Sequence, residues 1–180
     1  MSRVLVRSRR GSRDKILREL PGAAIIDVTS KGPDPWVRFS PFYPHGTIPV
    51  PFTPDRTAQS VEGVWQALKV FETADVDATK LDITAMKGLK RTVRRFGRCL
   101  GHREGLEGTR LLSYLDARRR IYLPTYTWVL ENCLAEELKQ LNALRKEQDL
   151  VLLDYETNTD IENLAKPLSH AGVIANALVT

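Results

Sequence analysis

Residues 23–28 read Ala-Ala-Ile-Ile-Asp-Val, a short apolar run whose only charge comes near its end. Such a run is typical of a β-strand that is buried on both faces. Working outward, Val4-Leu5-Val6 predicts another strand, and residues 14–20 between the two strands have helical character. Ser12 is in place to cap this helix, and Pro21-Gly22 ends it. The first thirty residues therefore predict a β-α-β unit, which is compatible with a right-handed parallel crossover.

The rest of the chain alternates loops with helical and strand-like segments. Residues 29–58 contain seven prolines and are predicted to be mostly loop, because proline lacks a backbone donor and fixes φ. Helices are predicted over residues 60–71, from about residue 85 to 100, from Pro124 to about residue 145 and over residues 167–178, with a strand over residues 150–153. We expect a mixed α/β (α+β) fold, with a small mixed sheet surrounded by helices, in a single domain over residues 1–180.

The composition is that of an ordinary globular protein. Of 180 residues, 42% are hydrophobic and 27% are charged, which disfavours a disordered chain. No apolar run approaches the length of a membrane span, and the N-terminus has no long apolar region typical of a signal peptide. We therefore expect a cytoplasmic protein without a membrane partner. Cys99 and Cys133 lie in predicted helices without metal-ligand spacing, so we expect two buried thiols and no metal or cofactor.

Charge is distributed unevenly along the sequence. Residues 87–120 contain eleven Lys or Arg residues against three acidic ones, a net charge of +8, whereas residues 149–180 carry a net charge of −4. The basic segment favours a polyanionic partner, and an exposed helix face rich in arginine explains the pattern equally well. Both hypotheses expect five side chains to be mostly exposed: Lys90, Arg91, Arg94, Arg95 and Arg98.

Two blocks of sequence carry a family resemblance. Residues 39–44 read Phe-Ser-Pro-Phe-Tyr-Pro, and residues 60–71 read Ser-Val-Glu-Gly-Val-Trp-Gln-Ala-Leu-Lys-Val-Phe. An aromatic loop followed by a helix with the pattern Glu-x-x-x-Gln-x-x-Lys is similar to the NADAR (YbiA-like) superfamily, of which the chain resembles a divergent member. The resemblance implies a YbiA-like fold with three parts: a β-α-β extension (1–30), the aromatic loop and motif helix (36–71), and a divergent C-terminal strand and helix (149–180).

The same resemblance implies an N-glycosidase. The family hydrolyses N-glycosidic bonds in substrates such as ADP-ribosylated guanine and phosphoribosyl intermediates of riboflavin synthesis. Because positive charge develops on the ribose as the bond breaks, a carboxylate is needed to stabilise it or to activate water, and Glu62 is the candidate. Gln66 would orient the base or a ribose hydroxyl, and Lys69 would neutralise phosphate or favour the charged form of Glu62.

Further residues are candidates for binding the substrate. Aromatic side chains in stiff loops can stack on a flat ring, Arg98 can contact phosphate, and acidic or amide side chains after a strand can line an α/β ligand site. The substrate-binding candidates are Trp36, Phe39, Ser40, Phe42, Tyr43, Trp65, Arg98, Asp154, Asn158 and Asp160. Two simpler interpretations stay open, namely that the aromatic rings belong to the core and that the last three residues form a turn.

The expected partner is a nucleotide or ADP-ribose-containing substrate, either free or in nucleic acid. The alternative is a non-catalytic module that binds ADP-ribose or nucleic acid through the same residues. A protein that binds nucleic acid through residues 87–120 alone is a third hypothesis, and the oligomeric state is left open.

Overall fold

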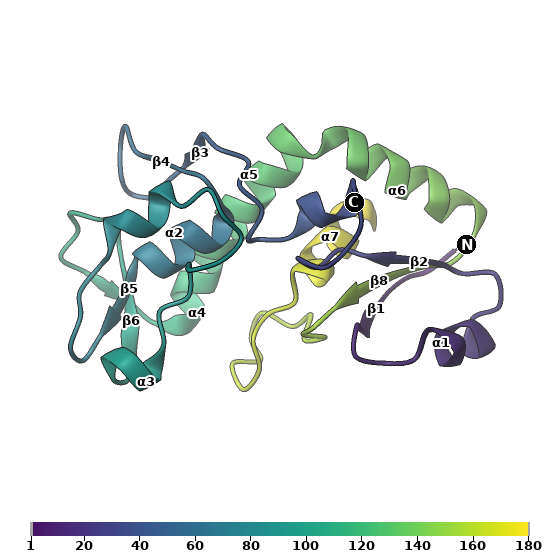
Figure 1. Cartoon of the computed structure of the whole chain (residues 1–180), viewed down its shortest axis with the longest axis horizontal. Helices are drawn as coiled ribbons and strands as arrows, with labels where there is room; N and C mark the ends of the chain where they lie inside the picture. The colour runs from purple at the N-terminus through teal and green to yellow at the C-terminus, as the bar shows by residue number, and fades with distance from the viewer. Residues whose placement is uncertain (1, 180) are drawn as a thin grey trace. The chain divides into compact units, whose positions relative to one another are not determined.

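The computed structural model describes residues 2–179, which form two compact units (Figure 1). The terminal unit comprises Met1–Ser40 and Leu130–Thr180, and the central unit comprises Pro41–Val129. Helices take up 39% of the residues and strands 17%, which confirms the mixed α+β class. None of the helices within residues 2–179 is both long and apolar enough to cross a membrane.

The terminal unit is built on a three-stranded parallel sheet in the order β1-β8-β2. Its strands are β1 (Val4–Ser8), β2 (Ala24–Asp27) and β8 (Leu150–Asp154), and its helices are α1 (Arg13–Glu19), the 3-10 turn η1 (Trp36–Phe39), α6 (Ala135–Glu147) and α7 (His170–Val179). The predicted β-α-β unit is present and its strands are parallel, but β8 lies between them. The Ser12 side chain caps α1 by accepting a hydrogen bond from the Lys15 backbone N–H, as predicted.

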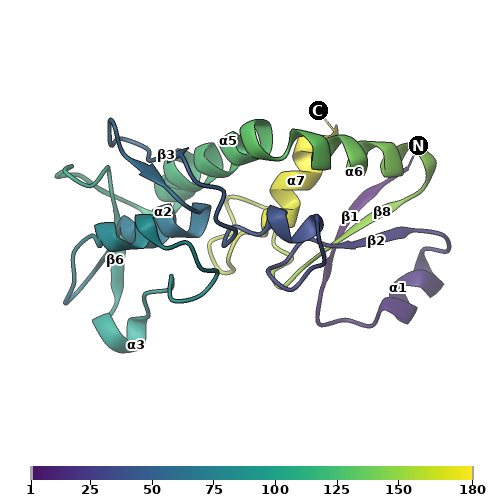
Figure 2. The same ribbon diagram turned by 45° about the horizontal axis from the view of Figure 1, so that its top comes forward.

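Helices cover both faces of this sheet (Figure 2). Ile16 of α1 and Leu20, which directly follows the helix, pack against Val151 and Leu153 on one face, and α7 packs on the other. Every residue of β8 is consequently buried, whereas β1 and β2 are only half-buried. The prediction that the strand at residues 23–28 is buried on both faces was wrong, because an edge strand has a neighbour on one side only.

The central unit combines short helices with antiparallel strands. Its elements are β3 (Ile48–Pro49), β4 (Thr57–Ala58), α2 (Val61–Ala67), β5 (Lys69–Phe71), η2 (Ala78–Asp82), α3 (Val93–Phe96), β6 (Cys99–Arg103), β7 (Leu111–Leu112), α4 (Tyr114–Ala117) and the π-helical segment η3 (Arg118–Tyr122). Strands β5, β6 and β7 form one antiparallel sheet, and β3 pairs with β4 in a hairpin. The strands described therefore divide among separate parallel and antiparallel sheets instead of joining in one mixed sheet.

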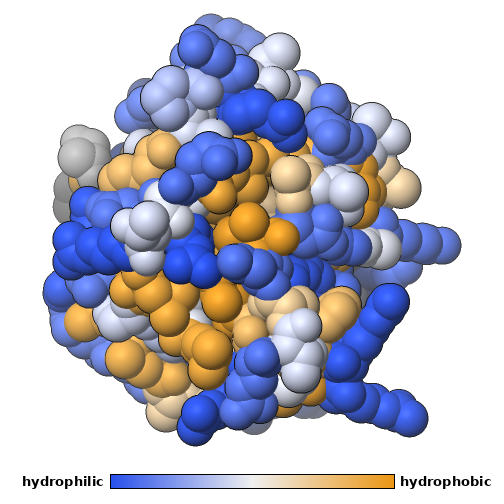
Figure 3. Space-filling model, turned by 90° about the vertical axis from the view of Figure 1, so that its left-hand side faces the viewer, coloured by the Kyte–Doolittle hydropathy of each residue, from blue (hydrophilic) through white to orange (hydrophobic). Residues whose placement is uncertain are grey.

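The core of the central unit gathers around α2. Val64, Ala67 and Leu68 pack in one cluster with side chains that include Leu112 and Ile121. The outer face of the molecule shown in Figure 3 mixes hydrophobic and hydrophilic side chains without one dominating. Exposed large apolar side chains of the central unit are Phe52, Val93, Leu100, Leu111 and Tyr114.

Two predicted helices are shorter than expected. The helix predicted over residues 60–71 ends at Ala67, so Lys69 lies on strand β5. The helix predicted from residue 85 to 100 is reduced to α3, because Gly88 and Gly97 have positive φ angles that end helical geometry. Cys99 therefore lies in a strand, and both cysteines are half-buried, not buried.

The third and fourth predicted helices also begin elsewhere. Pro124 does not start a helix, because α4, η3 and α5 (Leu123–Cys133) run on without a break and place it one residue into α5. The π-helical segment η3 before Pro124 changes the hydrogen-bond spacing just where this proline has no N–H to donate. The last helix begins at His170, three residues after the predicted start.

Candidate functional site

Helix α2 presents the polar residues of the sequence motif. Ser60 caps the helix by accepting a hydrogen bond from the Gly63 N–H (3.0 Å), and the Glu62 N–H donates to the Pro41 carbonyl (2.8 Å). A side chain on Gly63 would come within 2.7 Å of the Lys80 carbonyl oxygen. Glycine at this position therefore allows η2 to approach the helix closely, while the Glu62 side chain next to it stays half-buried.

The Glu62 carboxylate is held by Gln66. The Gln66 Nε2 donates to Glu62 Oε1 (2.7 Å), and the Gln66 Oε1 accepts from the Arg91 backbone N–H (3.0 Å). Because a backbone N–H can only donate, it fixes which end of the amide faces Glu62. Gln66 is only 3% exposed, so the helix positions one carboxylate through a buried and fully oriented amide.

Arg91 is the residue that secures this arrangement. Its guanidinium group donates to the carbonyl oxygens of Gln66 (3.1 Å), Lys69 (2.7 Å) and Asp75 (2.5 Å). It also lies 4.9 Å from the ring centroid of Phe71. Arg91 is 6% exposed, so the prediction that it belongs to an exposed basic stripe was wrong.

Four of the five basic residues singled out in the sequence are exposed, as expected: Lys90, Arg94, Arg95 and Arg98. Arg98 forms an ion pair with Glu72 (3.6 Å). The same Glu72 side chain accepts a hydrogen bond from the Arg98 backbone N–H (2.9 Å). The guanidinium group of Arg98 is largely in solvent, where it remains accessible to an anion.

Lys69 lies beside the motif helix and is electrostatically coupled to Glu62. Burial lowers the pKa of the Lys69 ammonium, and the Glu62 carboxylate opposes that shift. Across the sheet, Lys69 pairs in register with His102 of β6. Burial, and then the charge of Lys69, lower the pKa of His102 to about 3, so this imidazole is neutral at physiological pH.

His102 belongs to an aromatic cluster around Trp65. The His102 and Trp65 ring centroids are 3.8 Å apart, and Tyr114 and Tyr122 lie 6.1 and 5.7 Å from Trp65. Tyr122 comes from the π-helical segment, a geometry that is frequent at functional sites. His102 is 2% exposed, and neither ring nitrogen makes a well-formed hydrogen bond with the described residues.

The aromatic loop residues divide between the units. In the central unit the ring of Phe42 lies 5.6 Å from Lys90 Nζ, and Tyr43 contacts His45 with 4.8 Å between centroids. In the terminal unit Trp36 stacks on Phe39 at 6.3 Å. Phe39 and Ser40 are both buried, and Phe39 has no exposed surface.

The acidic and amide candidates of the terminal unit have structural partners. Asp154 Oδ2 accepts from the Ser169 hydroxyl (2.7 Å) and lies 2.9 Å from His170 Nδ1. Asn158 Nδ2 donates to the carbonyl oxygens of residues 163 and 166, and its Oδ1 accepts from the Asp160 N–H. These bonds are typical of a structured turn, the simpler interpretation of this segment.

A protein-family model described as "Family of unknown function (DUF6939)" matches residues 8–174. The chain belongs to DUF6939. The match extends from the end of β1 into α7 and includes every candidate residue of this DUF6939 protein. No curated protein and no solved structure matches the chain. Among residues 2–179, no group of three or more His, Cys, Asp and Glu side chains is arranged to hold a metal ion.

Sequence reasoning missed three parts of the central site: Arg91, His102 and the pair Tyr114 and Tyr122. The Glu62–Gln66 contact follows from their spacing of four residues on a helix. The partners of Arg91 and His102, in contrast, come from strands and loops that are distant along the chain. Only the helical periodicity of the motif helix could be recognised from the sequence.

Proposed function

We propose that this DUF6939 protein hydrolyses the N-glycosidic bond of a nucleotide-like substrate, with Glu62 as the reacting carboxylate. The observation that carries the proposal is the 2.7 Å hydrogen bond from Gln66 to Glu62, together with the buried Arg91 N–H that fixes the Gln66 amide. An exposed helix stripe does not need a buried amide to orient one of its carboxylates. A preorganised carboxylate, in contrast, is what charge development on a ribose requires.

In the proposed reaction the bond between ribose C1′ and the base nitrogen breaks, and the oxygen of a water molecule bonds to C1′. Glu62 stabilises the positive charge on the ribose and takes a proton from the water, while the base nitrogen takes a proton from solvent as it leaves. Glu62 then returns its proton to solvent, which balances the reaction. Lys69 supplies a positive charge close to Glu62 for the phosphate or diphosphate group of the substrate.

The substrate class follows from the resemblance to NADAR proteins and is supported by the side chains around Trp65. ADP-ribosylated guanine and phosphoribosyl-amino bases both combine a flat ring, a ribose and phosphate. An aromatic cluster suits the flat ring, and Lys69 with the exposed Arg98 suits the phosphate groups. No metal or organic cofactor enters this proposal.

The decisive experiment compares Glu62→Gln with the wild type on ADP-ribosylated guanine nucleotides, with release of free ADP-ribose followed by mass spectrometry. Glutamine keeps the size and hydrogen-bonding capacity of the side chain and removes its charge. We expect the rate to fall about a hundredfold or more, with binding of the substrate largely kept. Glu107→Gln, which changes an exposed carboxylate in the same unit, is the matched control and should keep wild-type turnover.

Three outcomes would count against the proposal. Wild-type turnover in a folded Glu62→Gln protein would remove Glu62 from the chemistry. An equal loss in Glu107→Gln would show that the effect is not specific to the site. Binding of ADP-ribose without any release from the conjugates would favour the non-catalytic binding module.

A further inference from the structure

The carboxyl edge of the parallel sheet carries basic and aromatic residues that the proposed function does not use. Arg9 and Arg10 directly follow β1, Tyr155 directly follows β8, and Lys31 lies in the loop after β2. Because the three strands are parallel, the segments after them meet at one edge of the sheet. Ligands of α/β proteins commonly bind at this edge, outside the carboxyl ends of the strands.

Both arginines contact the ring of Tyr155. The guanidinium carbon lies 5.5 Å from the ring centroid for Arg9 and 5.1 Å for Arg10. Arg10 Nη1 also donates to the Tyr155 carbonyl (3.2 Å), and Arg9 Nε donates to Asp27 Oδ2 (2.7 Å). The other N–H groups of these two side chains make no hydrogen bond with residues 2–179, which leaves donors of both forks facing outward.

Two carboxylates at this edge, Asp27 and Asp154, are already paired. Asp27 accepts from Arg9 and also from the Thr29 N–H (3.0 Å) and hydroxyl (2.6 Å). A side chain on Gly32 would lie 2.1 Å from the Asp27 carbonyl oxygen, so glycine keeps the loop that presents Lys31 tightly closed. Asp154 is directed into the unit, toward Ser169 and His170. These two carboxylates therefore leave the exposed charges of Arg10 and Lys31 without a neutralising partner among them.

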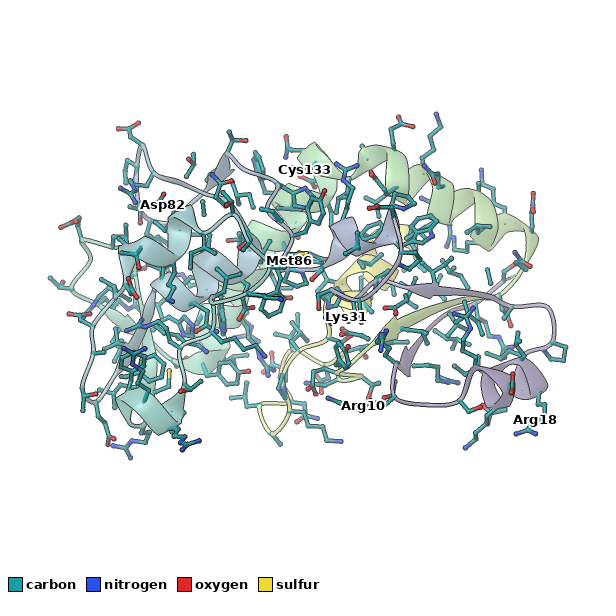
Figure 4. All side chains as sticks on the ribbon, in the orientation of Figure 1. Arg10, Arg18, Lys31, Asp82, Met86 and Cys133 are labelled. Atoms are coloured by element: carbon teal, nitrogen blue, oxygen red, sulfur yellow. The ribbon has the colours of Figure 1, made fainter. Side chains whose placement is uncertain are left out.

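Figure 4 shows how the labelled basic side chains of the terminal unit are distributed. Arg10 and Lys31 lie at the end of the unit where the strands end, whereas Arg18 lies on α1 at the opposite end. Arg10 and Lys31 are both exposed. The positive side chains of the edge are thus separate from those of α1, and the two groups can be tested independently.

We propose that this edge is a binding site for a small molecule that carries a phosphate ester or diphosphate group. Two guanidinium forks match the geometry of phosphate oxygens, and stacking on Tyr155 holds them in place before the ligand arrives. A nucleic-acid polymer suits the surroundings less well. The segment 156–166, which continues from Tyr155, carries three carboxylates and one lysine, and these would repel an extended polyanion.

Isothermal titration calorimetry of the full chain with inorganic pyrophosphate at low salt tests this site. Arg10→Gln removes the more accessible of the two guanidinium groups, and we expect it to weaken pyrophosphate binding about tenfold or more. Lys31→Gln, which alters an exposed loop residue with no structural hydrogen bond from its ammonium group among those described, should weaken binding severalfold. Arg18→Gln is the matched control and should bind as the wild type does.

Each alternative outcome is decisive. Unchanged affinity in both Arg10→Gln and Lys31→Gln, or an equal loss in Arg18→Gln, would overturn the site. Tighter binding of a short single-stranded oligonucleotide than of pyrophosphate, lost in Arg10→Gln, would overturn the small-molecule class. The edge shares no residue with the proposed N-glycosidase site, so failure of the N-glycosidase proposal would leave it standing.

Discussion

Each unit contains one deeply buried histidine, and the surroundings of the two have opposite effects on the charge of the imidazole. In the terminal unit, His170 Nδ1 lies 2.9 Å from the Asp154 carboxylate and its Nε2 lies 2.8 Å from the Val28 carbonyl. Both partners are acceptors, so both ring nitrogens carry hydrogen and the ring is an imidazolium. Burial opposes this charge, but Asp154 outweighs it and raises the pKa of His170. Burial is likewise outweighed at Asp154, where His170 lowers the pKa to about 2.

In the central unit, His102 is at least as buried but has no such partner. Each buried donor or acceptor without a hydrogen bond costs about 1–3 kcal/mol. His170 therefore joins α7 to the ends of β8 and β2 as a structural connection, whereas His102 weakens the unit that contains it. Buried polar groups without a hydrogen bond are rare in native structures, and a catalytic role is one of the reasons for which they are retained. Of the two histidines, His102 is therefore the better candidate for a functional role.

The largest expected effect comes from breaking the satisfied pair. Asp154→Asn removes the charge that stabilises the His170 imidazolium and leaves a buried histidine with a weaker partner. We expect the free energy of unfolding of the full chain to fall by about 3 kcal/mol or more, measured by chemical denaturation with circular dichroism. Asp160→Asn changes an exposed turn residue of the same segment and should cost less than about 1 kcal/mol. Equal costs in the two variants would mean that the pair is not a structural connection.

Much of the terminal unit could be predicted from the sequence because its signals are local. The cap at Ser12, the stop at Pro21-Gly22 and the apolar run of β8 each lie within a few residues of the element they define. That β8 would separate β1 from β2 was not predictable, because β8 is more than a hundred residues away along the chain. Its full burial is a consequence of that central position, which periodicity alone does not report.

The central unit was harder to predict because distant partners override local pattern. The helical spacing of α2 continues through Lys69, but pairing with β6 turns Lys69–Phe71 into a strand. Arg91 looks like its basic neighbours in the sequence and is buried only because three carbonyl oxygens converge on its guanidinium group. The resemblance of residues 60–71 to NADAR proteins pointed to Glu62 and Gln66, but it could not identify Arg91, whose backbone N–H holds the Gln66 amide.

At pH 7 a smaller effect, with a distinctive pH dependence, is expected for His102. The pKa of His102 is about 3 in the folded chain and about 6.5 when unfolded. Between these values the unfolded chain binds the extra proton, so His102 makes stability decrease as pH falls, by up to about 1.4 kcal/mol per pH unit. The raised pKa of His170 acts with the opposite sign, since its contribution is complete below about 6.5 and is lost as pH rises through its folded pKa.

The variant His102→Phe separates the contributions of the two histidines to the pH dependence of stability. Phenylalanine keeps a ring against Trp65 and removes two buried ring nitrogens that make no well-formed hydrogen bond, so unfolding at pH 7 should be unchanged or more costly by up to about 1 kcal/mol. Denaturation from pH 4 to 8 should show a shallower acid slope in the variant and an unchanged decline above about 6.5. Leu112→Ala, at a buried neighbour in the same sheet, is the control and should cost about 2–5 kcal/mol. An acid slope identical to that of the wild type would show that folding does not lower the pKa of His102.

The smallest expected effect concerns an ion pair on the surface of the terminal unit. Lys15 Nζ lies 4.0 Å from Glu19 Oε1 across one turn of α1, and the two side chains are 70% and 50% exposed. Water already solvates both charges, and holding two long side chains together costs conformational entropy, so such helical pairs contribute about 0.3–0.5 kcal/mol. Lys15→Gln should therefore change the free energy of unfolding by no more than about 0.5 kcal/mol, and less at high salt. Chemical denaturation of Lys15→Gln and of Asp154→Asn, each at low and at high salt, compares the two losses in the free energy of unfolding directly. A loss from Lys15→Gln comparable to that from Asp154→Asn would show that helix α1, and not the buried pair, limits the stability of the terminal unit.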